Sequence, residues 1–257
     1  MKIKSAKIII NGVDHGFFGR KYGKSEKLYA SLNCSKFVGD DDASVSQNLD
    51  IVKNEIRSRK LITLHQVHSN LCITVDQKTK SDIKADAMVT STPGVAIGIL
   101  TADCAPVLFL DRKNRIIGAA HVGWRGAASG IIKAAVQKMI ELGTDPRDVI
   151  AAVGPCIQKE SYEVDDNFRQ NFSDADNCFH HINHKMHFDL PKYCQNLLRQ
   201  AGLDDANIDV IAIDTYIKRE DYFSYRFATI NTGKICGRNI SAICLVKENG
   251  NNPRTGN

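Results

Sequence analysis

The chain has 257 residues, of which 43% are hydrophobic and 25% are charged, and its formal net charge is +5. This composition is typical of a globular protein that buries a sizeable core, so neither a metal nor disulfides are needed merely to hold the fold together. Because the charge is small and no block of five Lys or Arg residues occurs, we expect no nucleic-acid partner.

The first half of the chain is predicted to contain several strands and one helix. Residues 6–12, 61–69 and 71–76 have the β-branched or alternating apolar residues of strands. In residues 42–58, apolar side chains recur every three or four positions, which predicts an amphipathic helix.

The central part of the chain is the most apolar. Four of its segments are predicted to be strands: 95–103, 105–111, 115–123 and 148–155. A helix is predicted at 126–143, closed by Gly143 at its C-terminal end.

Towards the end of the chain, Asp189 and Pro191 stand where the start of a helix would place them, ahead of residues 192–202. Strands are predicted at 208–216 and 240–246. The whole pattern predicts an α/β or α+β fold with mixed β-sheets flanked by helices. Since no repeat or interior linker is visible, we expect a single domain over 1–257, with a flexible polar tail at 247–257.

The eight cysteines and the first residues bear on the compartment. No CxxC pair occurs, and MKIKSAKIII has only three consecutive isoleucines, which is too few for a signal peptide. No apolar run approaches the length of a transmembrane helix. We therefore expect a cytoplasmic protein with mostly free thiols and no membrane partner.

Two histidines lie in the segment HQVHS. On a strand, residues three apart point to opposite faces, so only one of His65 and His68 would face a pocket if the segment stays extended. We favour His68, because it lies at the end of the strand, beside Ser69 and Asn70, where functional groups are common. His65 is then expected to be a core or supporting histidine.

Cys104 lies in a turn between two apolar strands, and His121 ends the next strand. If a hairpin joins these strands, both residues lie near the same end of a sheet, where His68 could join them. One thiolate and two imidazoles could hold a catalytic zinc with an open fourth position. Spacing alone leaves two alternatives open: a thiolate–imidazole pair of a cysteine hydrolase, or a cysteine that is simply buried.

Copper is a further alternative, because electron-transfer copper sites use the same ligand types. A multicopper centre needs many more histidines than the eight in this chain. Four of them lie in FHHINHKMHF, which we predict to be a loop or hairpin. There His180, His184 and His187 have helical spacing but are expected to be exposed or structural.

Arginines in several motifs are candidates for binding an anion. Arg125 lies in HVGWRG, just before a predicted helix, where backbone N–H groups and a guanidinium can act together. Arg20 lies in GFFGRKYG. FSYR and CGRN contribute Arg226 and Arg238.

These motifs occur in an order that resembles the YfiH-like proteins. That family is also called the laccase-domain or polyphenol-oxidase family, and its members the YfiH-like purine nucleoside phosphorylases. The resemblance covers about residues 14–245, and TADC with HVGWRG after HQVHS is its most specific part.

The resemblance implies a fold, a metal centre and an activity. The family fold is a single α/β domain with mixed sheets, similar to the catalytic domain of the cytotoxic necrotising factor toxins. The family's metal ligands map onto His68, Cys104 and His121, and the metal is usually zinc. The activities are phosphorolysis of adenosine, inosine, guanosine and methylthioadenosine, together with adenosine deamination. Older labels state copper-dependent polyphenol oxidation.

Nucleoside and phosphate are thus the implied partners, and Arg20, Arg125 and Arg226 are the candidates for phosphate. The sequence departs from the family pattern at KYG (21–23), Val122, Phe227 and Cys236, which bears on substrate preference more than on the metal. A metal-free cysteine hydrolase or amidase using Cys104 and His121, a copper-dependent polyphenol oxidase and a non-catalytic binding protein remain alternatives. The sequence does not indicate the oligomeric state.

Overall fold

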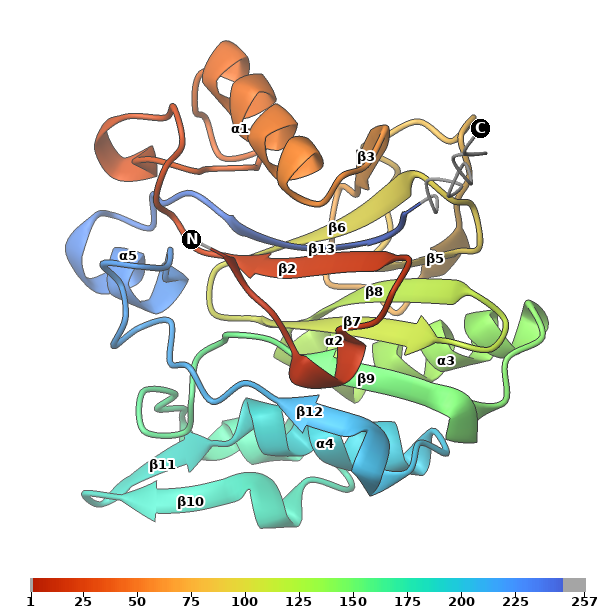
Figure 1. The fold of residues 1–257 in the computed structure, drawn as a ribbon. Helices are drawn as coiled ribbons and strands as arrows, with labels where there is room; N and C mark the ends of the chain where they lie inside the picture. Colours follow the sequence, from red (N-terminus) through yellow and green to blue (C-terminus); the bar gives the residue numbers. More distant parts are fainter. Residues whose placement is uncertain (1, 247–257) are drawn as a thin grey trace, which may run out of the picture.

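The fold is a stack of two β-sheets with helices on both outer faces (Figure 1). We describe it from a computed structural model, in which the described residues are 2–246. The predicted tail at 247–257 lies outside the described residues. Both sheets contain parallel and antiparallel pairs of strands. The expectation of an α+β fold with mixed sheets and flanking helices is therefore confirmed.

The strands of the five-stranded sheet are, in spatial order, β1 (Lys2–Ile3), β2 (Val13–Phe18), β13 (Asn239–Leu245), β6 (Val95–Thr101) and β3 (Lys60–Thr63). Those of the six-stranded sheet are β12 (Ile208–Val210), β9 (Val149–Val153), β7 (Ala105–Asp111), β8 (Ile116–Val122), β5 (Ala87–Thr90) and β4 (Cys72–Thr74). A separate hairpin pairs β10 (Phe179–Ile182) with β11 (Lys185–Phe188).

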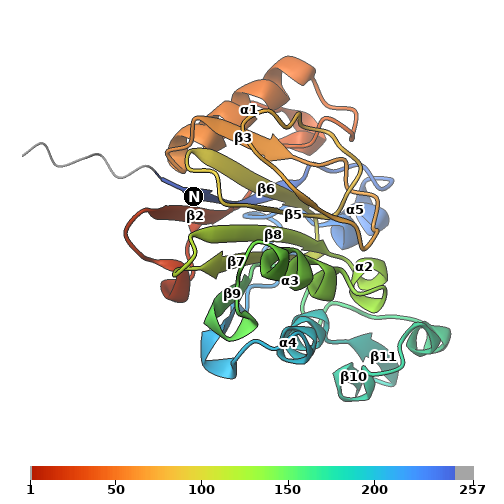
Figure 2. The ribbon, with the colours of Figure 1, turned by 90° about the vertical axis from the view of Figure 1, so that its right-hand side faces the viewer.

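The α-helices are α1 (Asp42–Glu55), α2 (Trp124–Ala128), α3 (Ile131–Glu141), α4 (Leu190–Gln200) and α5 (Tyr225–Asn231). Helix α1 covers the outer face of the five-stranded sheet, and α3 and α4 cover that of the six-stranded sheet. Figure 2 shows the short helices α2 and α5 at the same end of the two sheets. Among the described residues, no helix combines the length and the hydropathy needed to span a bilayer.

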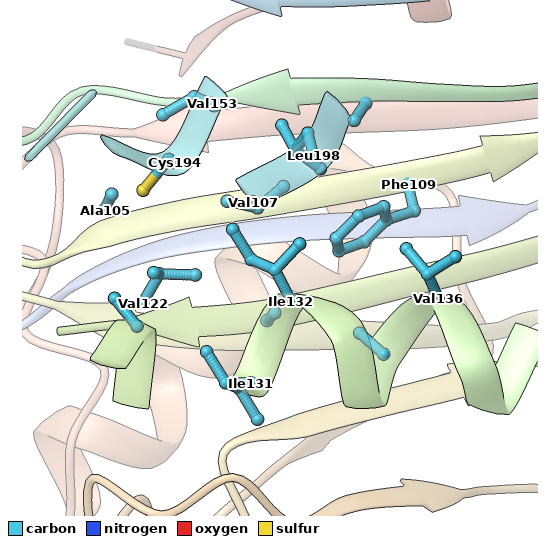
Figure 3. Close-up of a cluster of buried hydrophobic side chains, with 14 of the residues drawn as sticks. Ala105, Val107, Phe109, Val122, Ile131, Ile132, Val136, Val153, Cys194 and Leu198 are labelled. Carbon is cyan, nitrogen blue, oxygen red and sulfur yellow. The ribbon is translucent and has the colours of Figure 1, made fainter. Parts of the chain in front are cut away.

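Strand β7 shows why these segments are so apolar. Its side chains alternate between two buried faces, as the two-residue period of a strand requires. Val107 and Phe109 pack against Ile132 of α3 and its neighbours (Figure 3). Leu108 and Leu110 point into the core between the sheets. Since both faces are covered, the sequence has no polar alternation here, and the core firmly fixes the strand ends that carry the site.

Several predicted elements are wrong or have different bounds. Residues 6–12 form no strand: Ala6–Ile8 is a 3-10 helix, and Gly12 turns the chain with a φ of 74° into β2. The helix predicted at 126–143 is split into α2 and α3, because Gly130 adopts a left-handed φ of 92°. Such a conformation interrupts a right-handed helix and suits glycine.

The segments predicted as strands at 61–69 and 208–216 are strands only at their starts, since β3 ends at Thr63 and β12 at Val210. The sequence analysis predicts no element at strands β1, β2 and β5 or at helix α5. The predicted strands at 71–76, 95–103, 105–111, 115–123, 148–155 and 240–246, and the helices at 42–58 and 192–202, are confirmed with shifts at their ends.

Candidate metal centre

Three side chains from separate parts of the chain meet at one end of the six-stranded sheet. Ligand atoms of His68, Cys104 and His121 all lie within 4.8 Å of one another. In a tetrahedral zinc site, ligand atoms are roughly 3.5 Å apart, as follows from bonds of about 2.0 to 2.3 Å. The group could therefore bind a metal ion after small side-chain movements.

The hairpin of β7 and β8 brings two of these residues together. Ala105 pairs with Val122 and Pro106 with His121 across the hairpin, so Cys104 lies beside the end of β8. This is the arrangement that the sequence predicts. His121 is buried, Cys104 is half-buried and His68 is exposed, so the group lies between the protein interior and the pocket.

His68 reaches the group from a loop. Because β3 ends at Thr63, the argument that residues three apart on a strand face opposite ways does not apply here. His68 adopts a left-handed φ of 59°, and its ring lies 4.7 Å from that of His121, edge to face. His65 also lines the pocket, where it stacks on Phe37 with ring centroids 4.2 Å apart.

Asp86 organises the two histidines, and the sequence reasoning missed it. Its carboxylate is fully buried and accepts hydrogen bonds from the backbone N–H groups of Val67, His68 and Ser69 at 2.6 to 3.2 Å, and from the Ser69 hydroxyl at 2.7 Å. It also accepts from Nδ1 of His121 at 2.8 Å. One carboxylate thus shapes the loop of His68 and leaves Nε2 of His121 free as a ligand atom.

The charges of this group shift its pKa values. Burial alone would lower the pKa of His121, but the neighbouring Cys104 and the Asp86 carboxylate raise it to about 9. Although His68 as a whole residue is exposed, partial desolvation of its imidazole by the surrounding atoms lowers its pKa to about 4, helped by the positive charge of His121. Burial would raise the pKa of Asp86, but hydrogen bonds from His121 and Ser69 lower it to about 2. The carboxylate is therefore ionised at neutral pH.

Gly123 leaves the space between the ligands open. A Cβ atom at this position would lie 2.8 Å from Nδ1 of His68 and 3.0 Å from Sγ of Cys104. Both distances are too short for a carbon atom without displacement of its neighbours. The glycine of HVGWRG therefore allows the three candidate ligands to lie close together.

The group opens into a cavity of about 730 Å³, a volume within the range of small-molecule sites. The stacked rings of Phe37 and His65 and the rings of Trp124 and Tyr162 line it. Helix α5 forms a further wall. Such a mixture of flat apolar rings and a few polar groups is typical of sites that bind flat organic molecules.

Three arginines line the cavity: Arg125, Arg226 and Arg238. Among the described residues, the Arg125 guanidinium has no hydrogen-bond acceptor, and it lies 4.4 Å from the centre of the Trp124 ring. The guanidinium of Arg226 donates to the backbone oxygen of Glu163. That of Arg238 donates to the backbone oxygens of Cys236 and Gly237.

Arg20 lies elsewhere and is not among the residues that line the cavity. Its guanidinium donates to the backbone oxygens of Ala30 at 2.7 Å and Arg219 at 3.1 Å, and it stacks on the ring of Phe223. The motif around Arg20 therefore braces loops in this structure.

The histidine-rich segment is the hairpin of β10 and β11, and it forms no second group of metal ligands among the described residues. His187 is buried, and its Nδ1 lies 2.7 Å from the backbone oxygen of Lys159. His180 faces it across the hairpin, and His184 lies exposed in the turn. The expectation of exposed or structural histidines is confirmed.

Comparisons with known proteins agree on one family. The family profile described as multi-copper polyphenol oxidoreductase laccase matches residues 14–246. A protein named purine nucleoside phosphorylase from Rickettsia prowazekii is 33% identical over 226 residues, which cover 85% of this chain and 90% of that protein. Purine nucleoside phosphorylase YfiH from Escherichia coli is 31% identical, over 87% of this chain and 90% of that protein.

A solved structure shares the fold. The crystal structure of a hypothetical protein YfiH from Bacillus licheniformis superposes with a TM-score of 0.85 at 28% identity, over 91% of this chain and 93% of that one.

Proposed function

Since this chain belongs to the multi-copper polyphenol oxidoreductase laccase family, we propose that it is a zinc-dependent purine nucleoside phosphorylase with additional adenosine deaminase activity. Its proposed substrates are phosphate with adenosine, inosine, guanosine or methylthioadenosine. The names of the curated relatives support this proposal. The main structural support is that one cavity is lined both by the His68–Cys104–His121 group and by Arg125, whose guanidinium has no hydrogen-bond acceptor among the described residues.

The donor set favours zinc. Two imidazoles and one thiolate match the three protein ligands of catalytic zinc sites, which keep a fourth position for a reactant. Zinc held by His68, Cys104 and His121 would supply a Lewis acid at one end of the cavity. Asp86 orients His121, as a carboxylate does behind many metal-bound histidines.

Phosphate is proposed to bind near Arg125. Phosphorolysis brings an anion to C1′ of the ribose while the base leaves, through a transition state with oxocarbenium character. Such a site needs fixed cationic donors. Arg125 has all of its donors available, whereas Arg226 and Arg238 already donate to backbone oxygens. We therefore rank Arg125 first, and we place Arg20 last because it lies outside the cavity lining.

The nucleoside is proposed to lie against the aromatic side chains. A purine is flat and stacks well on rings such as those of Phe37, His65 and Tyr225, all of which border the cavity. Deamination would need the same base placed with its C6 toward the metal end. The sequence lacks the H-x-E and P-C-x-x-C signature of the known zinc nucleobase deaminases, so that activity would use this different set of residues.

A metal-free cysteine hydrolase or amidase is the second candidate function, and a specific contact favours it. Cys104 lies beside His121, whose Nδ1 is held by Asp86 at 2.8 Å. A thiol, an imidazole and a carboxylate that orients the imidazole also make up the catalytic site of a cysteine hydrolase. Copper-dependent polyphenol oxidation, which the family description suggests, needs more ligand sets than the single group of three found among residues 2–246.

A nucleoside panel with and without phosphate tests the proposal. The purified protein is analysed for bound metals, and its products from adenosine are separated by chromatography. Free adenine that requires phosphate, with about one zinc per chain, is the expected result. Inosine as a product reports the deaminase activity.

The alternatives give different results in the same assay. Adenine released without phosphate would indicate a hydrolase. If the purified protein contains no metal, and its activity is unaffected by chelators but lost without Cys104, the result would favour the cysteine hydrolase. Full turnover by Cys104→Ala would show that the proposed site is wrong.

A further inference from the structure

Helix α5 forms a wall of the cavity but is weakly held by apolar packing. Tyr225, Arg226, Thr229 and Ile230 all line the cavity, yet Ala228 is the one buried residue of the helix. The side chain of Ile230 is 64% exposed. Because burial of one small side chain stabilises a helix little, polar contacts must do most of the positioning.

The carboxylate of Asp103 supplies these contacts from a part of the chain that is distant in sequence. Its Oδ2 accepts a hydrogen bond from the backbone N–H of Arg226 at 2.6 Å and from the Ser224 hydroxyl at 3.0 Å. Its Oδ1 accepts from the Thr215 hydroxyl at 2.7 Å. Ser224 is the N-cap of α5 and accepts in turn from the N–H of Phe227. Asp103 thereby acts as a second cap, contributed by a distant segment.

The same residue shapes the turn that presents Cys104. Asp103 has a left-handed φ of 82°, and its backbone oxygen accepts from the N–H of Ile157 at 2.9 Å. The turn alone does not need a carboxylate, since glycine or asparagine adopts this conformation readily. A buried carboxylate is costly unless it is fully hydrogen-bonded. The hydrogen-bond donors of Thr215 and α5 therefore explain why this position carries a carboxylate.

We propose that Asp103 is a positioning residue that ties α5 to the turn of Cys104, and so fixes Arg226 and Tyr225 relative to the metal centre. It acts on substrate through α5 and does not touch the reacting atoms. The identity of the substrate in this inference rests on the proposed function, whereas the tether between Asp103 and α5 does not.

Hydrogen exchange tests the tether without any substrate. The variant Asp103→Ala is compared with Asp111→Ala. Asp111 lies at the opposite end of β7, is also buried, and accepts from the N–H groups of Lys113 and Asn114 in a turn at that end of the strand.

Peptides that cover residues 224–231 should exchange at least about tenfold faster in Asp103→Ala, because a hydrogen bond to a charged group is lost at the helix start. They should be unchanged in Asp111→Ala. Unchanged exchange in Asp103→Ala, or the same acceleration in both variants, would overturn the proposal. If Asp103→Ala does not fold, Ser224→Ala removes one donor to Asp103 together with the cap, and it should show the same local effect.

Kinetics with adenosine and phosphate test the consequence for substrate. Asp103→Ala should raise KM for adenosine about tenfold or more, change kcat less, and keep its zinc. Asp103→Asn should restore most of the affinity, because an amide oxygen can accept from Arg226 N–H while its NH₂ donates to the Thr215 hydroxyl.

Loss of zinc without faster exchange of α5 would assign Asp103 to the metal centre and contradict the proposal. If the wild-type protein does not turn over nucleosides, the proposed function fails, but the exchange experiment still decides whether Asp103 holds α5.

Discussion

The end of the cavity with the candidate metal ligands, here called the metal end, and the wall formed by α5 are built in opposite ways. His121 and Asp86 lie on or beside central strands of a sheet whose both faces are buried, and the Asp86 carboxylate is fully enclosed. Helix α5 is seven residues long, and Ala228 is the single buried side chain in it. Packed strands hold His121 and the neighbouring Asp86 in place, whereas the wall depends on a few hydrogen bonds to Asp103.

This difference suggests a division of labour. A metal centre needs ligands held within a few tenths of an ångström, which core strands provide. A wall that admits and releases a substrate benefits from lower local stability. Mutations at the metal end should therefore abolish metal binding, and mutations around α5 should change substrate affinity.

The largest effect is expected at Cys104. Cys104→Ala removes the only sulfur ligand of the group, so zinc binding should be lost and nucleoside turnover should fall by on the order of 10³-fold or more. Zinc content and adenine release measure this. Cys72→Ala, at a buried position of the edge strand β4, is the matched control and should keep both. Zinc retained by Cys104→Ala would contradict the metal centre.

A smaller effect is expected at Asp86. Asp86→Asn leaves one oxygen for the N–H groups of the His68 loop and for Nδ1 of His121, so affinity for zinc should fall by about 10- to 100-fold. Competition with a coloured chelator measures it. Asp111→Asn alters an equally buried turn carboxylate and should leave zinc affinity unchanged. Equal losses in both variants would mean that the effect is general destabilisation.

A substitution of Arg125 tests the proposed binding of phosphate. Because its guanidinium has no acceptor among residues 2–246, Arg125→Ala should raise KM for phosphate by about tenfold while zinc content and stability stay the same. Arg20→Ala should instead lower stability and leave KM for phosphate unchanged, since Arg20 donates to two backbone oxygens outside the cavity. An equal rise of KM for phosphate in Arg20→Ala would contradict this ranking.

The last prediction concerns pH and the metal-free protein. The folded pKa of His121 is about 9, above the value of about 6.5 for an unfolded histidine. The stabilisation from its extra proton is therefore complete below pH 6.5 and is lost as the pH rises towards 9. The free energy of unfolding should fall by up to roughly 1.4 kcal/mol per pH unit in this window.

Urea unfolding of the metal-free protein at several pH values measures this slope. In Asp86→Asn the slope should be smaller, because Asp86 is one of the charges that raise the pKa of His121. A slope that is the same with and without Asp86 would contradict the assignment.

Local patterns predicted the part of the site that local structure builds. The apolar runs around Cys104 and His121 predict the hairpin of β7 and β8, and its pairing brings both residues to one end of the sheet. The geometry of His68 could not be derived in the same way, because the strand argument assumed an extended segment that ends at Thr63. The family resemblance, and not spacing, selected the metal among the alternatives.

Long-range contacts account for what the sequence did not reveal. Asp86 stands in the run KADAMVT, where a charged residue among small apolar ones was a usable signal of a buried role. The contacts of Asp103 with Thr215 and Arg226 join residues more than a hundred positions apart, and no local pattern encodes them. For the same reason Arg20 and Arg238 could not be ranked before the fold placed only Arg238 at the cavity.

The distribution of the cysteines has a practical consequence. All eight are unpaired; seven are buried and Cys104 alone is half-buried. Burial also raises the pKa of the thiols of Cys34, Cys156 and Cys194. A mild alkylating reagent should therefore modify a single site in the native molecule. Bound zinc would shield that sulfur, so counting reactive thiols should report directly what fraction of a preparation carries its ion.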